Sequence, residues 1–131
     1  RLAKHLESRG FSVENLGVDS EDSVDYPDKA REACSRYLAD GGYEFGVLCC
    51  GTGIGISISA NKIKGIRCAL PQNIFAAQMA REHNDANFIA FGGRIEYWEP
   101  AEKMLDAFID VAFGGGRHGR RVEKIMGLEG C

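Results

Sequence analysis

The chain has 131 residues, of which 44% are hydrophobic and 27% are charged, and its formal net charge is −3 at pH 7. This length suits one domain with one core, residues 1–131, and the acidic balance argues against nucleic acid as the main partner. No apolar run is long enough to cross a membrane, and no secretory signal is visible.

Five cysteines occur, an odd number, without CxxC pairs or zinc-type Cys/His spacing. Reduced thiols of this kind are typical of cytosolic proteins, so we expect a cytoplasmic protein.

The N-terminal part alternates between helical and extended patterns. Residues 1–9 predict a helix that stops at Gly10, and residues 11–16 predict a strand. Residues 19–25 are acidic and loop-like.

A second helix is predicted to begin at Pro27 and to run to about Ala39, where Gly41 and Gly42 end it. Proline suits the first turn of a helix because it has no N–H to leave unpaired. The expected inner face carries Ala30, Cys34, Tyr37 and Leu38.

The most informative stretch is Gly46 to Lys62, GVLCCGTGIGISISANK. Residues 45–50 predict a buried strand, and a glycine-rich turn leads from it into a helix that ends near Lys62. Backbone N–H groups in such a turn, together with a helix N-terminus, form a cradle for an anion. The stretch lacks the spacing of a P-loop or of a full dinucleotide fingerprint. From these residues alone, Cys50 is either a reactive thiol at the cradle or a thiol that fills the strand end.

The C-terminal half continues the alternation. Strands are predicted over 66–70 and 88–91, and helices over 73–82, 97–113 and 117–127. Residues at 3-4 spacing, Trp98, Ala101, Leu105, Phe108 and Ala112, predict one packed face, and Val122, Ile125 and Met126 are expected to point inward.

Strands that alternate with helices predict an α/β fold, a three-layer α/β/α sandwich around a parallel, Rossmann-like sheet. Ligands bind such sheets beyond the carboxyl ends of the strands. We therefore expect three segments to converge there: the loop after Cys50, residues 83–87 and residues 92–94.

Several motifs, in this order along the chain, resemble ribose-5-phosphate isomerase type B: CGTGIGISISANK (50–62), GIR (65–67), REHNDAN (81–87), FGGR (91–94) and GGRHGRRVEKI (115–125). The similarity covers essentially the whole chain. The related galactose-6-phosphate isomerases share the glycine loop but typically lack the HND and RHxxR pair. The family opens with a strand that carries an Asp-His pair, and this chain has no such segment, so we expect the N-terminal strand to be missing.

The resemblance implies an aldose–ketose isomerisation of ribose 5-phosphate and ribulose 5-phosphate, in the non-oxidative branch of the pentose phosphate pathway, through a cis-enediolate. Cys50 matches the base, Thr52 is placed to bond the thiolate or the substrate, and His83 matches the acid/base that opens the sugar ring. Substrate contacts are implied for Gly51, Thr52, Gly53, Ile54, Gly55, Asn84, Arg94, Arg117, Arg121 and Tyr26. No metal or organic cofactor is implied. The resemblance also implies a homodimer or tetramer with the site at the subunit interface.

Plainer interpretations stay open for several of these residues. His83 at a helix end can cap the last carbonyls, and the basic run at 117–121 can be a solvated helix face. Other functions also remain: an isomerase of an allose, galactose or tetrulose phosphate, or an inactive sugar-phosphate-binding module. A redox role for adjacent Cys49 and Cys50 is disfavoured because their disulfide is strained.

Overall fold

The structure, a computed structural model, describes residues 1–17 and 25–130. The predicted acidic loop therefore lies outside the described residues, apart from its last position. Within them the elements, in chain order, are α1 (Leu2–Ser8), α2 (Tyr26–Asp40), β1 (Gly46–Cys50), α3 (Ile54–Asn61), β2 (Cys68–Ala69), α4 (Ile74–Glu82), β3 (Phe88–Gly92), α5 (Ala101–Asp110), α6 (Arg117–Gly127) and a short 3₁₀ turn, η1 (Leu128–Gly130).

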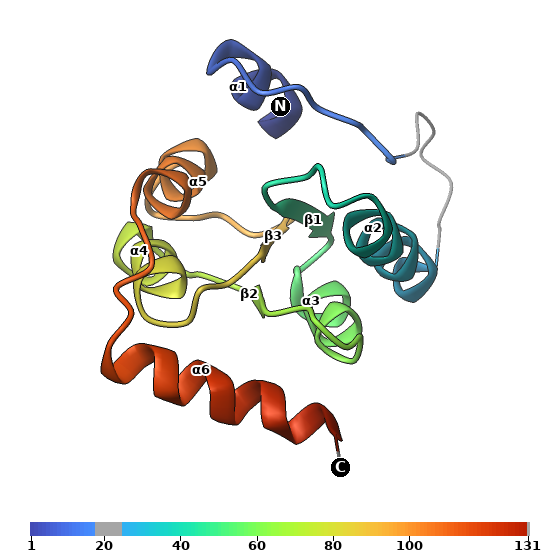
Figure 1. The fold of residues 1–131 in the computed structure, drawn as a ribbon. Helices are drawn as coiled ribbons and strands as arrows, with labels where there is room; N and C mark the ends of the chain where they lie inside the picture. The colour runs from blue at the N-terminus through green and yellow to red at the C-terminus, as the bar shows by residue number, and fades with distance from the viewer. Residues whose placement is uncertain (18–24, 131) are drawn as a thin grey trace.

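The three strands form a parallel sheet in the order β1-β3-β2. The central strand, β3, places Ala90 beside Leu48 and Gly92 beside Cys50, and all of its residues are buried. In Figure 1, α2 and α3 lie on one side of the sheet, and α4 and α5 lie on the other. The predicted three-layer α/β/α sandwich is confirmed.

Each face of the sheet has its own hydrophobic core. The core under α1, α4 and α5 is built around Ile89, Met104 and Phe108, which are fully buried. The core under α2 and α3 includes Cys34 and Phe88, and Cys50 packs against its edge. Burial raises the pKa of the Cys34 thiol to about 11, which suits the structural role that its spacing predicted.

The strand predicted over 11–16 is wrong, because these residues have no regular structure. Phe11 and Val13 do pack against the first core. Residues 11–17 and residues 45–49 line the same cavity of about 1070 Å³. No strand among the described residues pairs with the segment, so it has no ladder to join there. The strand predicted over 66–70 is present only as Cys68–Ala69.

The helix predicted over 97–113 is shorter, because Pro100 stands at its N-cap. Proline has no backbone N–H and keeps the preceding residue out of helical conformation, so the helix cannot run through this position. Ala101, Leu105 and Phe108 are buried as predicted. The prediction for Trp98 is wrong, since its side chain is fully exposed ahead of the helix.

Two other packing predictions fail on exposed helix faces. No residue of α6 is buried, and Ile125 is 43% exposed although it was expected to point inward with Val122 and Met126. Figure 1 shows α6 crossing the outside of the molecule. Leu38 on α2 is likewise exposed. Periodicity identifies the apolar face of a helix, but it does not say whether other elements of the same chain pack against that face.

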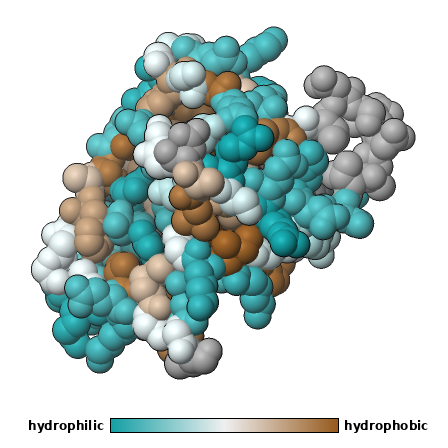
Figure 2. Space-filling view, turned by 45° about the vertical axis from the view of Figure 1, so that its right-hand side comes forward, coloured by the Kyte–Doolittle hydropathy of each residue, from teal (hydrophilic) through white to brown (hydrophobic). Residues whose placement is uncertain are grey.

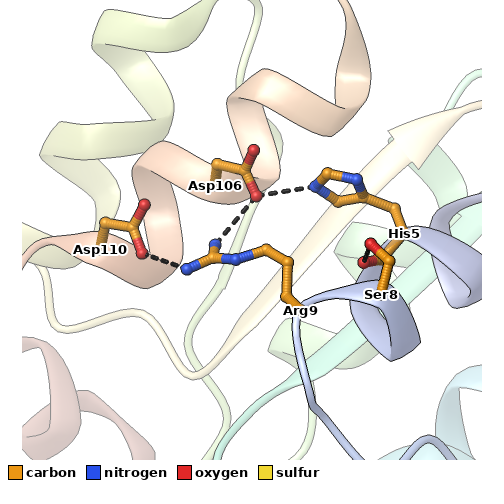
Figure 3. Close-up of polar contacts among 5 residues, drawn as sticks. All are labelled: His5, Ser8, Arg9, Asp106 and Asp110. Carbon is orange, nitrogen blue, oxygen red and sulfur yellow. Dashed lines mark hydrogen bonds and ion pairs between the residues drawn. The ribbon is translucent and has the colours of Figure 1, made fainter.

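Helix α1 is fastened to α5 by a small charged network, drawn in Figure 3. His5 Nε2 lies 2.7 Å from Asp106 Oδ1, and Arg9 Nη1 lies 2.9 Å from the same oxygen. The other guanidinium nitrogen of Arg9 lies 2.6 Å from Asp110 Oδ1. Burial raises the pKa of the Asp106 carboxyl, but the hydrogen bonds from His5 and Arg9 outweigh it, so this pKa lies below its ordinary value.

Because the pKa of Asp106 is depressed in the folded chain, its carboxylate adds stability above the ordinary carboxyl pKa and loses that contribution in acid. We expect Asp106→Asn to lower the free energy of unfolding at pH 7 by up to about 1 kcal/mol, since the side chain is one-third exposed. At a pH of about 3 the difference between variant and parent should shrink. Urea unfolding followed by circular dichroism at both pH values measures it. An equal difference at both would contradict the role of the carboxylate.

Candidate active site

The first cluster of candidate residues lies where β1 ends and α3 begins. The Sγ atom of Cys50 accepts a hydrogen bond from the backbone N–H of Gly53, over 3.2 Å. Thr52 Oγ1 accepts one from the N–H of Ile54, also over 3.2 Å. A thiol at a helix N-terminus that already receives an N–H is favourably placed to carry negative charge.

Two further predicted residues border this loop. A side chain at Gly55 would meet the ring of Tyr26 at 2.6 Å, so the glycine allows the tyrosine to lie over the start of α3. Arg94 joins from the end of β3, where its N–H donates to the carbonyl of Gly51 over 2.9 Å. Its side-chain Cδ would lie 3.6 Å from a Cβ at Gly51. The thiol, the loop and the arginine therefore gather at the carboxyl end of the sheet, as predicted, and the tyrosine lies against the same loop.

Gly53 is the glycine on which this geometry depends most. Its φ is +80°, and a Cβ there would lie 2.9 Å from the carbonyl carbon of Phe91 and 2.7 Å from Leu70 Cδ1. We expect Gly53→Ala to lower the free energy of unfolding by roughly 2–4 kcal/mol, from left-handed strain plus overpacking against backbone.

The matched control for that substitution is Gly115→Ala, because Gly115 has φ +64° and nothing within 4 Å of an added Cβ. It should cost only the backbone term, about 1–2 kcal/mol. Urea unfolding followed by circular dichroism compares the two variants. Equal losses would show that contact with β3 does not constrain the loop.

The second cluster lies at the other end of the sheet. Residues 83–87 precede β3, and Asn87 accepts through its carbonyl from the N–H of Gly46, the first residue of β1. This segment is thus at the amino end of the strands, while Cys50 is at the carboxyl end. The expected convergence of residues 83–87 with the cysteine loop is wrong within one chain. In a parallel sheet all amino ends of the strands lie on one side and all carboxyl ends lie on the opposite side.

The amino-end cluster is itself well defined. The rings of His83 and His118 stack with centroids 4.0 Å apart and an interplanar angle of 13°. The pKa of His118 is lowered, first by burial and then by the positive charges of His83, Arg117 and Arg121. Asn84, the residue that follows His83, is exposed. A concentration of cationic groups on an accessible surface favours an anionic ligand such as a phosphate.

His118 is the residue of this cluster that the sequence analysis did not place in the site. It belongs to the RHGRR motif, but nothing in local spacing indicates that it meets His83 across two helices. Two other thiols of the described residues differ from Cys50 in their surroundings. Burial raises the pKa of Cys68 to about 12, and Cys49 is exposed while Cys50 packs inward, so the two adjacent thiols face different surroundings.

Within residues 1–17 and 25–130, no helix has the length and apolar character needed to span a membrane.

Comparison with known proteins agrees with these observations. Residues 1–125 match the family described as Ribose/Galactose Isomerase. Ribose-5-phosphate isomerase B of Escherichia coli is 41% identical over 128 residues, which are 98% of this chain and 85% of that protein. D-erythrulose-4-phosphate isomerase of Pectobacterium atrosepticum is 38% identical over 125 residues, 95% of this chain and 82% of that protein.

Solved structures give the same result. The crystal structure of ribose-5-phosphate isomerase B from Mycoplasma genitalium with bound ribulose-5-phosphate superposes with a TM-score of 0.90 at 35% sequence identity. The match covers 98% of this chain and 86% of that one. The resemblance inferred from the motifs is confirmed: the chain belongs to the ribose/galactose isomerase family, a family of aldose–ketose isomerases.

Proposed function

We propose that this protein interconverts ribose 5-phosphate and ribulose 5-phosphate. The observation that carries the proposal is the Cys50 thiol, which accepts the N–H of Gly53 at the start of α3, in a loop whose Gly51 lies against Arg94, in a chain of this family. A base within a loop of backbone N–H donors is what aldose–ketose isomerisation needs.

The reaction moves one proton between carbons and one between oxygens. Cys50 as thiolate removes the proton from C2 of the open aldose, the C–H electron pair forms the C1–C2 double bond, and the electron pair of the C1 carbonyl moves onto O1, which gives a cis-enediolate. The O2 hydroxyl then passes its proton to O1 as the C2 carbonyl forms, and the Cys50 thiol returns its proton to C1. The N–H groups from Gly51 to Gly55 and the hydroxyl of Thr52 stabilise the negative oxygen. Thr52 Oγ1 already accepts from Ile54, so its own O–H proton is available to donate.

The other residues bind and open the sugar. His83 exchanges the proton that opens the furanose ring, and Asn84 bonds a hydroxyl. Arg94, Arg117 and Arg121 contact the phosphate, for which planar bidentate donors are well suited. Tyr26, against Gly55, forms a wall of the sugar pocket.

A complete site of this composition needs two copies of the chain. Cys50 and Arg94 lie at the carboxyl ends of the strands. His83, Arg117 and Arg121 lie at the amino ends, so this second group must come from a neighbouring subunit. We propose a homodimer in which each chain supplies one group to each of two sites. Apolar side chains are available for such contact: Ile54 and Ile58 on α3 are more than half exposed. Figure 2 shows one face on which apolar residues reach the surface among hydrophilic ones.

The free thiols further support a reducing, cytoplasmic compartment.

Proton NMR of ribose 5-phosphate with this protein in deuterated buffer tests the proposal. We expect ketose signals to appear and the C2 proton signal of the remaining aldose to disappear, because the base exchanges its proton with solvent. A spectrum that stays unchanged would contradict the assignment.

The family description and the names of relatives point to two alternative substrates, galactose 6-phosphate and D-erythrulose 4-phosphate. The same NMR experiment distinguishes them by which sugar is converted. Binding of all three without conversion would assign the protein as a sugar-phosphate-binding module.

A further inference from the structure

The turn that carries His83 has an unusual residue at its sharpest point. Asp85 has φ +46°, and among the described residues it is the one non-glycine residue with a positive φ. The turn closes α4 by hydrogen bonds from the N–H of Asp85 to the carbonyl of Arg81 and from the N–H of Ala86 to that of Ala80. Helices usually end in this way with glycine, so an aspartate here indicates a use for its side chain or its fixed backbone.

Two arginines hold Asp85 from either side. Nε and Nη2 of Arg67 both donate to the main-chain carbonyl of Asp85, over 3.0 and 2.8 Å. The carboxylate of Asp85 lies 3.6 Å from Arg67 Nη2 and 3.5 Å from Arg81 Nη1. Both arginine side chains are more than four-fifths buried. A forked guanidinium on one carbonyl fixes the direction of the peptide as well as its position.

Arg67 is itself rigidly placed at the beginning of β2. Its N–H donates to the side chain of Asn87 over 2.8 Å, and its carbonyl accepts from the N–H groups of Asn87 and Phe88. The third guanidinium nitrogen, Nη1, donates to the Sδ atom of Met126 on α6 over 3.3 Å. One side chain therefore contacts both the turn that follows α4 and the helix that carries the RHGRR motif.

These two segments carry the residues of the cationic cluster, so their relative position decides whether the cluster forms. His83 is two residues before Asp85, while His118, Arg117 and Arg121 come from α6. A hydrogen bond from the N–H of Gly114 to the carbonyl of Glu82 joins them at the start of α6. Arg67 joins them again further along the helix, through Met126.

We propose that Arg67 is a positioning residue: acting through Asp85 and Met126, it fixes His83 relative to Arg117 and Arg121, so that one sugar phosphate meets both the ring-opening imidazole and the phosphate-binding arginines. This inference rests on the proposed function of that cluster, and it adds a residue that touches no substrate.

The test compares Arg67→Lys and Asp85→Gly with the control Arg9→Lys. Lysine keeps the charge at position 67 but cannot fork onto the carbonyl of Asp85. Glycine at position 85 suits φ +46° and removes only the carboxylate. In the control, lysine at position 9 removes a guanidinium that contacts two groups, the carboxylates of Asp106 and Asp110, away from the cluster. The chain has three histidines, so the imidazole NMR signals of His83, His118 and His5 can be assigned by substitution.

We expect the His83 and His118 signals to shift in Arg67→Lys and in Asp85→Gly, and to stay unchanged in Arg9→Lys. kcat/KM for ribose 5-phosphate should fall about tenfold or more in the first two variants, as for other small misplacements of substrate-contacting groups.

Unshifted histidine signals in both cluster variants would overturn the role of Arg67, whatever the activities are. Lack of turnover in the parent protein would contradict the proposed function instead, and would leave the NMR result to decide the positioning by itself.

Discussion

Cys50→Ser is expected to abolish isomerisation, with a loss of about 10²–10⁴-fold or more in kcat, because a serine hydroxyl cannot act as the base near neutral pH. The Gly53 N–H and the arginines remain in the variant, so binding of ribose 5-phosphate should be retained within a few-fold. Loss of the C2 proton signal in deuterated buffer measures the chemistry, and calorimetric titration measures the binding.

Cys49→Ser is the matched control for this experiment. It makes the same atomic change one residue earlier, at an exposed thiol on the other face of β1. The control should keep the activity of the parent. An active Cys50→Ser protein would remove Cys50 from the role of base, and an equal loss in both variants would indicate damage to β1 rather than loss of the base.

Mixing two inactive variants is expected to restore activity. Cys50→Ser and His83→Ala each destroy every site of their own homodimers, if each site takes Cys50 from one subunit and His83 from the other. When the two are unfolded and refolded together, half of the dimers are mixed, and each mixed dimer has one intact site. The expected activity is about a quarter of that of the parent.

The control for this mixture pairs Cys50→Ser with the double variant Cys50→Ser/His83→Ala, which can form no intact site. A mixture of the single variants that stays as inactive as this control would show that sites are not shared between subunits. Sedimentation of the parent protein would then report whether a dimer forms at all.

The local structure around the candidate site was predictable from the sequence. An apolar run followed at once by glycines predicted β1, the tight loop and α3, and each is present within a few residues. Pro27 and Gly41 correctly marked the ends of α2, since both act through their own backbone geometry. These features depend on residues that are neighbours in the sequence, and so the sequence carries them.

Pairing and placement were decided only by the tertiary structure. Residues 11–16 have a strand-like pattern, but no strand in the described part of the chain pairs with them. Trp98 fits the spacing of a helical stripe, but Pro100 starts the helix after it. The order β1-β3-β2, together with the parallel direction of the strands, separates His83 from Cys50. The sequence determined which candidate side chains this protein carries and what chemistry each type can perform. Whether a residue lies at the amino or the carboxyl ends of the strands depends on hydrogen bonds between strands far apart in the chain, and no local pattern specifies them.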